Sequence, residues 1–393
     1  MTFDKLATRL TPHYSHFRVG ERLLFTGHSH QAWPDVAREG MVECYDMAAR
    51  HVDEKWGLAF DKAEILRGYL RDWYQDPDGL YCLAGNTHML LVSWLSSLGL
   101  TANSRIITTS SEFHSMYRQL HRLAEEGIEV VMVDPQPAET FVDRIAEAIN
   151  DSTAAIMMSR VFFETGLICQ SLADIAKLAR EKEIPFLIDD YHGTNVAPLS
   201  ITTEELADCY LVTGGYKYLQ WGEGNCFLRY PKDCKLRPVV TGWYASFTSL
   251  EQARSDKPTH YDDGNQRFAT ATYDPTSQFR AAKVVEFFKE QELTQEVLRN
   301  QYVAQLTYFR DSFKNADLNP DIIQPVHEQS LDHNGGFLSF KTSYAGILQS
   351  ALNDTGVLTD NRGDILRFGV APYIRKQQID DAVAILSRWV NQL

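Results

Sequence analysis

The chain has 393 residues, of which 44% are hydrophobic and 23% are charged, as is usual for a protein with a sizeable core. A chain of this length predicts two domains, or one large domain with an appendage. The formal net charge of −14 argues against a surface that binds nucleic acid or an anionic membrane, because such surfaces need clusters of basic residues.

No targeting segment, membrane span or metal motif stands out. The first residues, MTFDKLATRLTPHYSHF, lack the apolar core of a signal peptide, and no window approaches the ~18 apolar residues of a membrane span. The six cysteines lie far apart, without a CxxC pair or a metal-ligand spacing. We therefore expect a cytoplasmic protein with buried free thiols and no metal site.

In chain order, the first predicted feature is a loop, FTGHSHQAWP, that ends at Pro34 and precedes a helix. From residue 79 onward, short apolar runs alternate with helical patterns such as SLADIAKLAREKE. The runs are LYCLAG, RIITTS, IEVVMVD, AAIMMSRV, IPFLIDD, CYLVTGG and NCFLRYP. This alternation predicts an α/β large domain, about residues 61–255, with a mostly parallel sheet covered on both faces. We expect residues 1–60 to contribute to the active site and to a small domain.

The remainder predicts a smaller α+β domain over residues 256–393. Residues 256–275 are polar and turn-rich and are typical of a connection. Helical patterns follow in FRAAKVVEFFKEQ and around Val303 to Phe313. Two short strands, GGFLSF and DILRFGV, and a last amphipathic helix, IDDAVAILSRWV, complete this domain.

Ligands of open α/β sheets bind beyond the carboxyl ends of the strands, and chemically active residues stand there. One apolar run ends in Asp189-Asp190-Tyr191-His192, and the next ends in Gly214-Gly215-Tyr216-Lys217. An acid and a lysine in these positions could form a plain surface ion pair. A lysine in a desolvated pocket can instead be an unprotonated nucleophile. Pyridoxal 5'-phosphate (PLP) needs such an amine, together with a carboxylate that faces its pyridinium nitrogen.

A third segment, Ala84-Gly85-Asn86-Thr87-His88, stands at the junction of a strand and a helix. Asn86 or Thr87 can cap the free N–H groups of the helix start. The same geometry also suits a phosphate.

Together these segments resemble the class V branch of the fold-type-I PLP enzymes, and within it kynureninase. The matching segments, in order along the chain, are FTGHSHQAWP, GNTHMLL, VFFETG, DDYHG, GGYKYLQWGEG, TGWYA, RFATAT and LRFGVAPY. The chain departs from the family's patterns at His28, at Phe163, which replaces a tyrosine, and at Ala271, which replaces a glycine. The resemblance implies the PLP-dependent transferase fold of type I, with a seven-stranded sheet in the large domain.

The resemblance also implies roles at the cofactor. Lys217 would hold PLP as a Schiff base and later move the α-proton. Asp189 would pair with the pyridine nitrogen, with Asp190 as the alternative. His192 would lie near the phenolic oxygen of the cofactor.

The phosphate and the ring would have their own ligands. Asn86, Thr87 and Tyr216 would hold the phosphate, and Phe113 or a neighbour would stack on the ring. Thr272 would reach the phosphate from the partner subunit, since such sites form between the two protomers of a homodimer.

The remaining implied roles concern an amino-acid substrate. Arg367 would grip its α-carboxylate with a bidentate fork. The alternative for Arg367 is a structural ion pair with Asp360 or Asp364. The loop with His28 and Ser29 would contribute to the substrate site, and His51 and Trp243, together with Trp56, would line an aryl pocket.

The reaction is left open among several classes. Kynureninase-type hydrolysis of the Cβ–Cγ bond of a γ-keto amino acid is one, and an aminotransferase, lyase or epimerase on the same scaffold is another. A cysteine desulfurase is disfavoured because it needs a cysteine shortly before the arginine, and Cys234 is the last cysteine. A binding module without catalysis is disfavoured by the intact Lys217, Asp189 and Arg367. A nicotinamide-binding fold is disfavoured because no GxGxxG joins an early strand to a helix.

Overall fold

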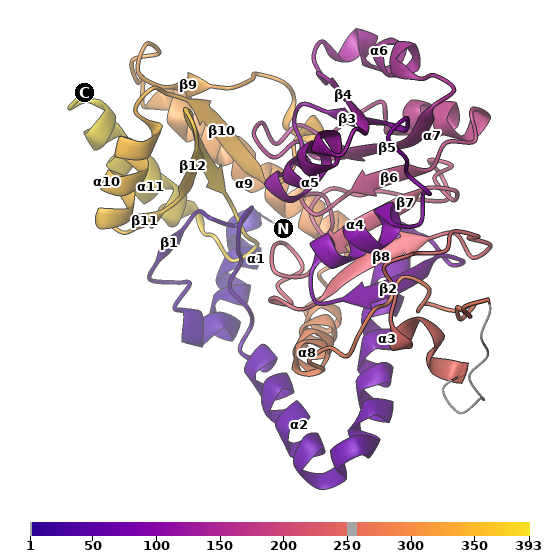
Figure 1. Cartoon of the computed structure of the whole chain (residues 1–393). Helices are drawn as coiled ribbons and strands as arrows, with labels where there is room; N and C mark the ends of the chain where they lie inside the picture. Colours follow the sequence, from indigo (N-terminus) through magenta and orange to yellow (C-terminus); the bar gives the residue numbers. More distant parts are fainter. Residues whose placement is uncertain (1, 250–257) are drawn as a thin grey trace.

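The computed structural model describes residues 2–249 and 258–393, and its large domain is built on a seven-stranded sheet (Figure 1). The strand order is β2-β8-β7-β6-β5-β3-β4. The strands are β2 (Leu80–Ala84), β3 (Arg105–Thr109), β4 (Glu129–Val133), β5 (Thr153–Ser159), β6 (Phe186–Asp189), β7 (Tyr210–Gly214) and β8 (Cys226–Tyr230). Only β8 runs antiparallel to its neighbours, β2 and β7. The prediction of a mostly parallel sheet from seven apolar runs is confirmed.

Both faces of this sheet are buried, which explains why its strands are apolar without interruption. Along β5, Ile156 and Met158 pack into one core, whereas Ala155 and Met157 pack into the other. Because side chains alternate between the faces of a strand, a run that serves two cores must be apolar throughout. The connecting helices are α4 (Thr87–Leu95), α5 (His114–Glu125), α6 (Phe141–Ala148) and α7 (Leu172–Glu181), with a short 3-10 turn η3 (Ala138–Thr140) before α6.

The N-terminal segment joins the two domains. Its elements are α1 (Phe3–Leu10), η1 (Thr11–Phe17), β1 (Leu23–Leu24), α2 (Val36–His51), η2 (Val52–Glu54) and α3 (Lys55–Tyr74). The predicted loop up to Pro34 and the helix after it are confirmed. Strand β1 pairs in parallel with β11 (Val357–Leu358) near the other end of the chain. Helices α2 and α3 form a long pair that extends away from the rest of the molecule (Figure 1).

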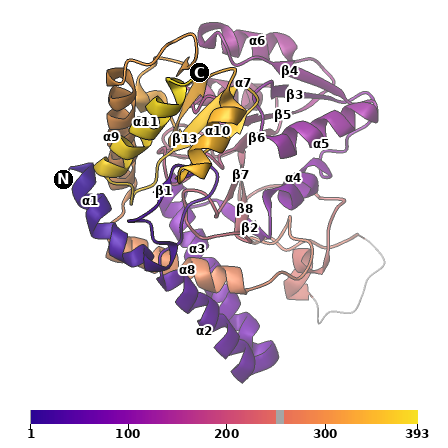
Figure 2. The same ribbon diagram turned by 90° about the vertical axis from the view of Figure 1, so that its left-hand side faces the viewer.

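The small domain contains a four-stranded antiparallel sheet in the order β12-β13-β10-β9. Its strands are β9 (Gln324–Pro325), β10 (Phe337–Lys341), β12 (Asp360–Arg362) and β13 (Ile365–Gly369). The helices after the connection are α8 (Thr276–Glu290), α9 (Gln295–Asn315), α10 (Ala345–Asp354) and α11 (Lys376–Val390), with the 3-10 turn η5 (Leu331–His333). Another 3-10 turn, η4 (Trp243–Ser249), comes before the connection. Helices α9, α10 and α11 lie together on one side of the molecule (Figure 2). The predicted small-domain strands and helices are confirmed, whereas the boundaries at residues 60 and 255 stay predictions.

The two domains meet at the carboxyl ends of the large-sheet strands. The segment after β5 pairs with the small domain through Leu167 and Asn334, and Thr26 of the N-terminal loop pairs with Gly369 at the end of β13. Three parts of the chain that are distant in sequence therefore converge where the sheet rule places a ligand. In the described part of the chain, no helix is long and apolar enough to cross a membrane.

Candidate active site

A pocket of about 350 Å³ opens at this edge of the large sheet. Seven of the residues singled out in the sequence line it, namely Asn86, Thr87, Phe113, Asp189, His192, Tyr216 and Lys217. They come from the ends of β6 and β7 and from the starts of α4 and α5, so the strand-end rule brings them together from distant parts of the sequence.

Lys217 lies at the centre of this pocket, just beyond β7. The backbone before it approaches its neighbours closely, since a methyl group added to Gly214 would lie 2.3 Å from the Tyr191 ring. The side chain of Lys217 is buried, and its Nζ lies 2.9 Å from His192 Nε2 and 4.7 Å from the centre of the Tyr191 ring. Burial lowers the pKa of Lys217 to about 7, although the charge of Asp189 opposes this shift. A substantial fraction of the amine is therefore neutral near pH 7.

Asp189 and Asp190 are neighbours in sequence but have different surroundings. Asp189 lines the pocket, and its Oδ1 accepts a hydrogen bond of 2.9 Å from the Tyr191 backbone N–H. Burial raises the pKa of Asp189 to about 6. Asp190 is fully buried away from the pocket, where it forms a 2.6 Å ion pair with Arg160 and accepts a 2.8 Å hydrogen bond from the Tyr74 hydroxyl. Of the two carboxylates, only Asp189 can meet a ligand in the pocket.

His192 connects the lysine to the N-terminal loop. Its Nε2 lies 2.9 Å from Lys217 Nζ and 3.2 Å from the backbone oxygen of His28. Burial, followed by the charge of Lys217, lowers the pKa of His192 well below its ordinary value. The imidazole is therefore neutral at physiological pH and takes part through hydrogen bonds.

The start of α4 forms one wall of the pocket. The Asn86 side chain caps this helix by accepting a 2.9 Å hydrogen bond from the Met89 N–H, as the capping interpretation expects. Nothing lies within 4 Å of a methyl group added to Gly85, so the space before the helix is open. A helix start with free N–H groups beside an open cradle suits an anion such as a phosphate.

A buried acid that the sequence analysis did not single out lies beside this pocket. Glu112 accepts hydrogen bonds of 2.5 Å from the Thr109 hydroxyl and 2.7 Å from the Ser159 hydroxyl. Burial raises the pKa of Glu112 to about 7. Ser159 lines the pocket and is the direct cross-strand partner of Asp189, so Glu112 supports the floor of the pocket from behind. Its position just after an apolar run, like that of Asp189, was the signal in the sequence.

Arg367 is buried, does not line this pocket and is already paired. Its Nε and Nη2 donate hydrogen bonds of 2.9 and 2.6 Å to the two carboxylate oxygens of Asp360, and its Nη1 donates one of 2.6 Å to the Phe163 backbone oxygen. The ion pair expected as the alternative for Arg367 is thus present with Asp360. Asp364, the other candidate, lies 3.9 Å from Lys341 instead.

Several other predicted residues do not line the pocket of this chain. Ser29 is partly buried in the N-terminal loop, His51 is exposed at the end of α2, Thr272 is exposed, and Trp243 is 46% exposed. The side chain of His28 also points elsewhere, because its Nε2 contacts Asp360 at 2.8 Å.

Trp243 belongs to an aromatic cluster that includes Trp56 and Tyr273, the neighbour of Thr272. Tyr244 bridges the cluster, with its ring centre 6.2 Å from that of Trp56, 4.4 Å from that of Trp243 and 5.6 Å from that of Tyr273. Trp56, Trp243 and the neighbour of Thr272 therefore gather in one cluster, and none of them lines the pocket of the same chain.

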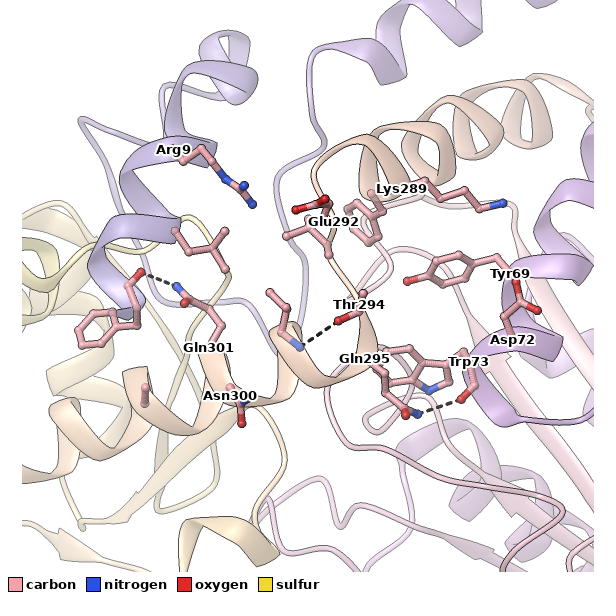
Figure 3. A pocket seen from close by; sticks show the side chains of 16 residues that line it. Arg9, Tyr69, Asp72, Trp73, Lys289, Glu292, Thr294, Gln295, Asn300 and Gln301 are labelled. Atoms are coloured by element: carbon pink, nitrogen blue, oxygen red, sulfur yellow. Dashed lines mark hydrogen bonds between the residues drawn. The ribbon is translucent and has the colours of Figure 1, made fainter. Parts of the chain in front are cut away.

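A larger cavity, of about 860 Å³, lies between α1, α3 and the start of α9 (Figure 3). Its walls include Leu6, Trp73 and Val297. Some of its polar side chains form hydrogen bonds within the wall, and Gln295, for example, donates one to the Trp73 backbone oxygen. None of the residues singled out in the sequence lines it. Among the described residues, no group of three or more His, Cys, Asp or Glu side chains could hold a metal ion.

Comparison with known proteins gives two family matches. Residues 45–295 match the family described as aminotransferase class-V, and residues 298–386 match the kynureninase C-terminal domain. Kynureninase from Pseudomonas fluorescens is 25% identical over 304 residues, which cover 73% of this chain and 67% of that protein. Cysteine desulfurase IscS from Shewanella halifaxensis is 24% identical over 220 residues, which cover 53% of this chain and 54% of that protein.

Solved structures show the same fold. A C-DES mutant with glycine covalently linked to its PLP cofactor aligns with a TM-score of 0.82 at 18% identity, covering 96% of this chain and 98% of that chain. The cysteine desulfurase CsdA from Escherichia coli aligns with a TM-score of 0.80 at 14% identity, covering 98% of this chain and 99% of that chain. The expected fold-type-I architecture is thereby confirmed.

Proposed function

Because the chain belongs to the aminotransferase class-V family of PLP-dependent enzymes, we propose that it binds PLP at Lys217 and acts on an amino acid. One observation carries this proposal. The buried amine of Lys217 lies 2.9 Å from His192 in a pocket that Asp189 also lines. A desolvated amine with a pKa of about 7 is a nucleophile at neutral pH, as attachment to an aldehyde requires.

The residues of the pocket fit PLP part by part. The first turn of α4, with Thr87 and Tyr216 nearby, would hold the phosphate, and Phe113 offers an aromatic face whose centre is 5.1 Å from Lys217 Nζ. Asp189 would face the ring nitrogen. When bound, PLP supplies an electron sink for negative charge that develops at Cα of the substrate.

Three side chains of the pocket would each have a separate role in the reaction. Asp189, as a carboxylate, would keep the ring nitrogen protonated. The Lys217 amine, close to its pKa at neutral pH, would take and return the proton at Cα. His192, neutral and fixed between Lys217 and the His28 backbone, would orient the amine.

Kynureninase-like hydrolysis of a Cβ–Cγ bond is the reaction that these features support best. The match to the kynureninase C-terminal domain covers β10, β13 and Arg367, and the Phe337 ring of β10 lies 5.8 Å from the ring of His192, which lines the pocket. A desulfurase would need an accessible thiol, but all six cysteines are buried. Cys226 lines the pocket, yet burial raises its pKa to about 12, so its thiol is protonated.

An aminotransferase, lyase or epimerase on another amino acid is the second candidate. The observation in its favour is that His51 and Trp243, the predicted aryl-pocket residues, do not line the pocket within one chain. Such an enzyme would keep Lys217 and Asp189 and differ in the substrate pocket.

In a homodimer, Trp243 and Thr272 of one protomer can contribute to the pocket of the other. Thr272 and Trp243 are exposed, and so are the apolar side chains of Tyr45 and Val239 at 75% and 81%. Aromatic residues are enriched at protein interfaces relative to the rest of the surface. We propose that Thr272 and the aromatic cluster of one protomer complete the pocket of its partner.

The test is a spectrum of the purified protein with PLP, before and after borohydride, followed by L-kynurenine and a panel of amino acids and keto acids. A visible band that borohydride removes supports attachment to an amine. Anthranilate and alanine as products from L-kynurenine would support the hydrolase. A half-transamination with another amino acid alone would favour the second candidate, and a protein that takes up no PLP would refute both.

A further inference from the structure

The ion pair between Arg367 and Asp360 leaves part of the guanidinium free. A guanidinium carries five N–H groups, one on Nε and two on each terminal nitrogen. Asp360 takes the Nε hydrogen and one Nη2 hydrogen, and the Phe163 backbone oxygen takes one Nη1 hydrogen. One hydrogen therefore remains on each terminal nitrogen. A carboxylate can accept hydrogen bonds from both terminal nitrogens of a guanidinium.

The position of Asp360 is fixed by the hairpin that carries both residues. Strands β12 and β13 are joined by a two-residue turn at Gly363, and the register places Asp360 directly opposite Arg367. In this register Asp360 meets Arg367 along its Nε side, through Nε and Nη2. The guanidinium is further enclosed by the Phe163 and Phe337 rings, whose centres lie 5.9 and 5.7 Å from Cζ.

His28 secures Asp360 from the other side. Its Nε2 lies 2.8 Å from Asp360 Oδ1, and its ring packs against Phe337 with ring centres 4.8 Å apart. Burial lowers the pKa of His28 to about 4, so the ring is neutral and Nε2 carries the hydrogen that it donates. The backbone oxygen of the same residue contacts His192 in the pocket.

We propose that Asp360, secured by His28, is a positioning residue that turns the two free N–H groups of Arg367 toward the α-carboxylate of the substrate. This inference rests on the proposed function, because it takes an α-amino acid as the substrate. Under this proposal Arg367 has both of the roles considered for it. Its ion pair with Asp360 orients the guanidinium, and the guanidinium binds the substrate carboxylate. Asp360 is then a determinant of specificity for ligands with a free carboxylate next to the amine.

The experiment compares L-alanine with L-alaninamide as ligands of the PLP-loaded protein, measured through the change in the cofactor's absorbance. The wild type should bind L-alanine more tightly, because only the carboxylate can use both donors. In Asp360→Ala and in the more conservative Asp360→Asn, affinity for L-alanine should fall about tenfold or more, while affinity for L-alaninamide changes little. The ratio of the two affinities should therefore collapse toward one.

Asp364→Asn is the matched control. Asp364 lies in the turn of the same hairpin, is exposed, and has only a distant contact to Lys341. This variant should keep the wild-type ratio and the wild-type affinity for PLP. An equal loss of both ligands in Asp360→Asn would mean a merely structural role and would overturn the proposal. Tighter binding of L-alanine in either variant would also overturn it, because Asp360 would then be a competitor of the substrate.

A second readout does not depend on the cofactor. In NMR spectra of the PLP-free protein, the Arg367 Nε–H should be protected from exchange, and Asp360→Asn should expose it while the fold is retained. An unprotected Nε–H in the wild type would refute the positioning geometry. If the wild type shows this protection but takes up no PLP or amino acid, the proposed function fails separately from the geometry.

Discussion

Two cavities of this protein differ in size and in chemistry, and the smaller one gathers the reactive side chains. The 860 Å³ cavity between α1, α3 and α9 has largely apolar walls, and its charged side chains, such as Lys289 and Glu292, are exposed. The 350 Å³ pocket gathers Lys217, Asp189 and His192, all with shifted pKa values. Perturbed ionisation in a cleft is a better indicator of function than volume. The predictions below test this contrast, from the largest expected effect to the smallest.

Replacing the lysine should have the largest effect. Lys217→Ala removes the only amine among the described residues that line the smaller pocket, so we expect loss of the borohydride-sensitive band and a fall in turnover of about 10³-fold or more. Absorbance spectroscopy and single-turnover kinetics would measure both. Persistence of the reducible band would show that another amine holds the cofactor.

Replacement of Asp189 and of its neighbour Asp190 should affect different properties, turnover in the first case and stability in the second. Asp189→Asn should keep the fold and bound PLP but reduce turnover about 100-fold, because the ring nitrogen loses its charge partner. Asp190→Asn leaves the buried Arg160 without a counter-charge and should destabilise the fold by about 3–5 kcal/mol. Urea unfolding and steady-state kinetics on both variants separate the two effects. The reverse pattern would assign the cofactor to Asp190.

The pH dependence of PLP uptake should reflect the desolvated amine. Lys217 loses its proton as the pH rises through about 7, instead of about 10.5, because burial disfavours its charged form. The rate of uptake should therefore rise from pH 6 and level off above pH 8, relative to the reaction of PLP with Nα-acetyllysine. A rate that keeps rising in parallel with the free lysine up to pH 10 would show that the amine is not desolvated.

Changes in the larger cavity should have the smallest effect. Asn300→Ala and Lys289→Ala remove exposed wall side chains that form no hydrogen bond with another residue in the described part of the chain. We expect kinetic constants within about twofold of the wild type and stability within about 0.5 kcal/mol. A tenfold loss of kcat/KM would show that this cavity contributes to function.

The sequence predicted the large sheet well because each of its strands serves two cores and is apolar throughout. It placed Lys217 and Asp189 at strand ends by the same logic. It missed the pairing of β1 with β11, because two-residue strands carry no periodicity. The roles of Glu112 and His28 depend on which side chains meet across strands and domains, which a single sequence does not specify.

The sequence failed for a different reason to predict where His51, Trp243 and Thr272 lie relative to the pocket. Their predicted roles came from the resemblance, and none of them lines the pocket of the same chain. Whether they act on a neighbouring protomer depends on assembly, which local sequence patterns do not encode.

The double contact of His28 has a mechanical consequence. Its imidazole is tied to Asp360 on the small-domain sheet, while its carbonyl is tied to His192 beside the lysine. His28 therefore links the small-domain sheet to the pocket through two hydrogen bonds. A displacement of Asp360 that keeps both bonds would be passed on to His192, the neighbour of Lys217.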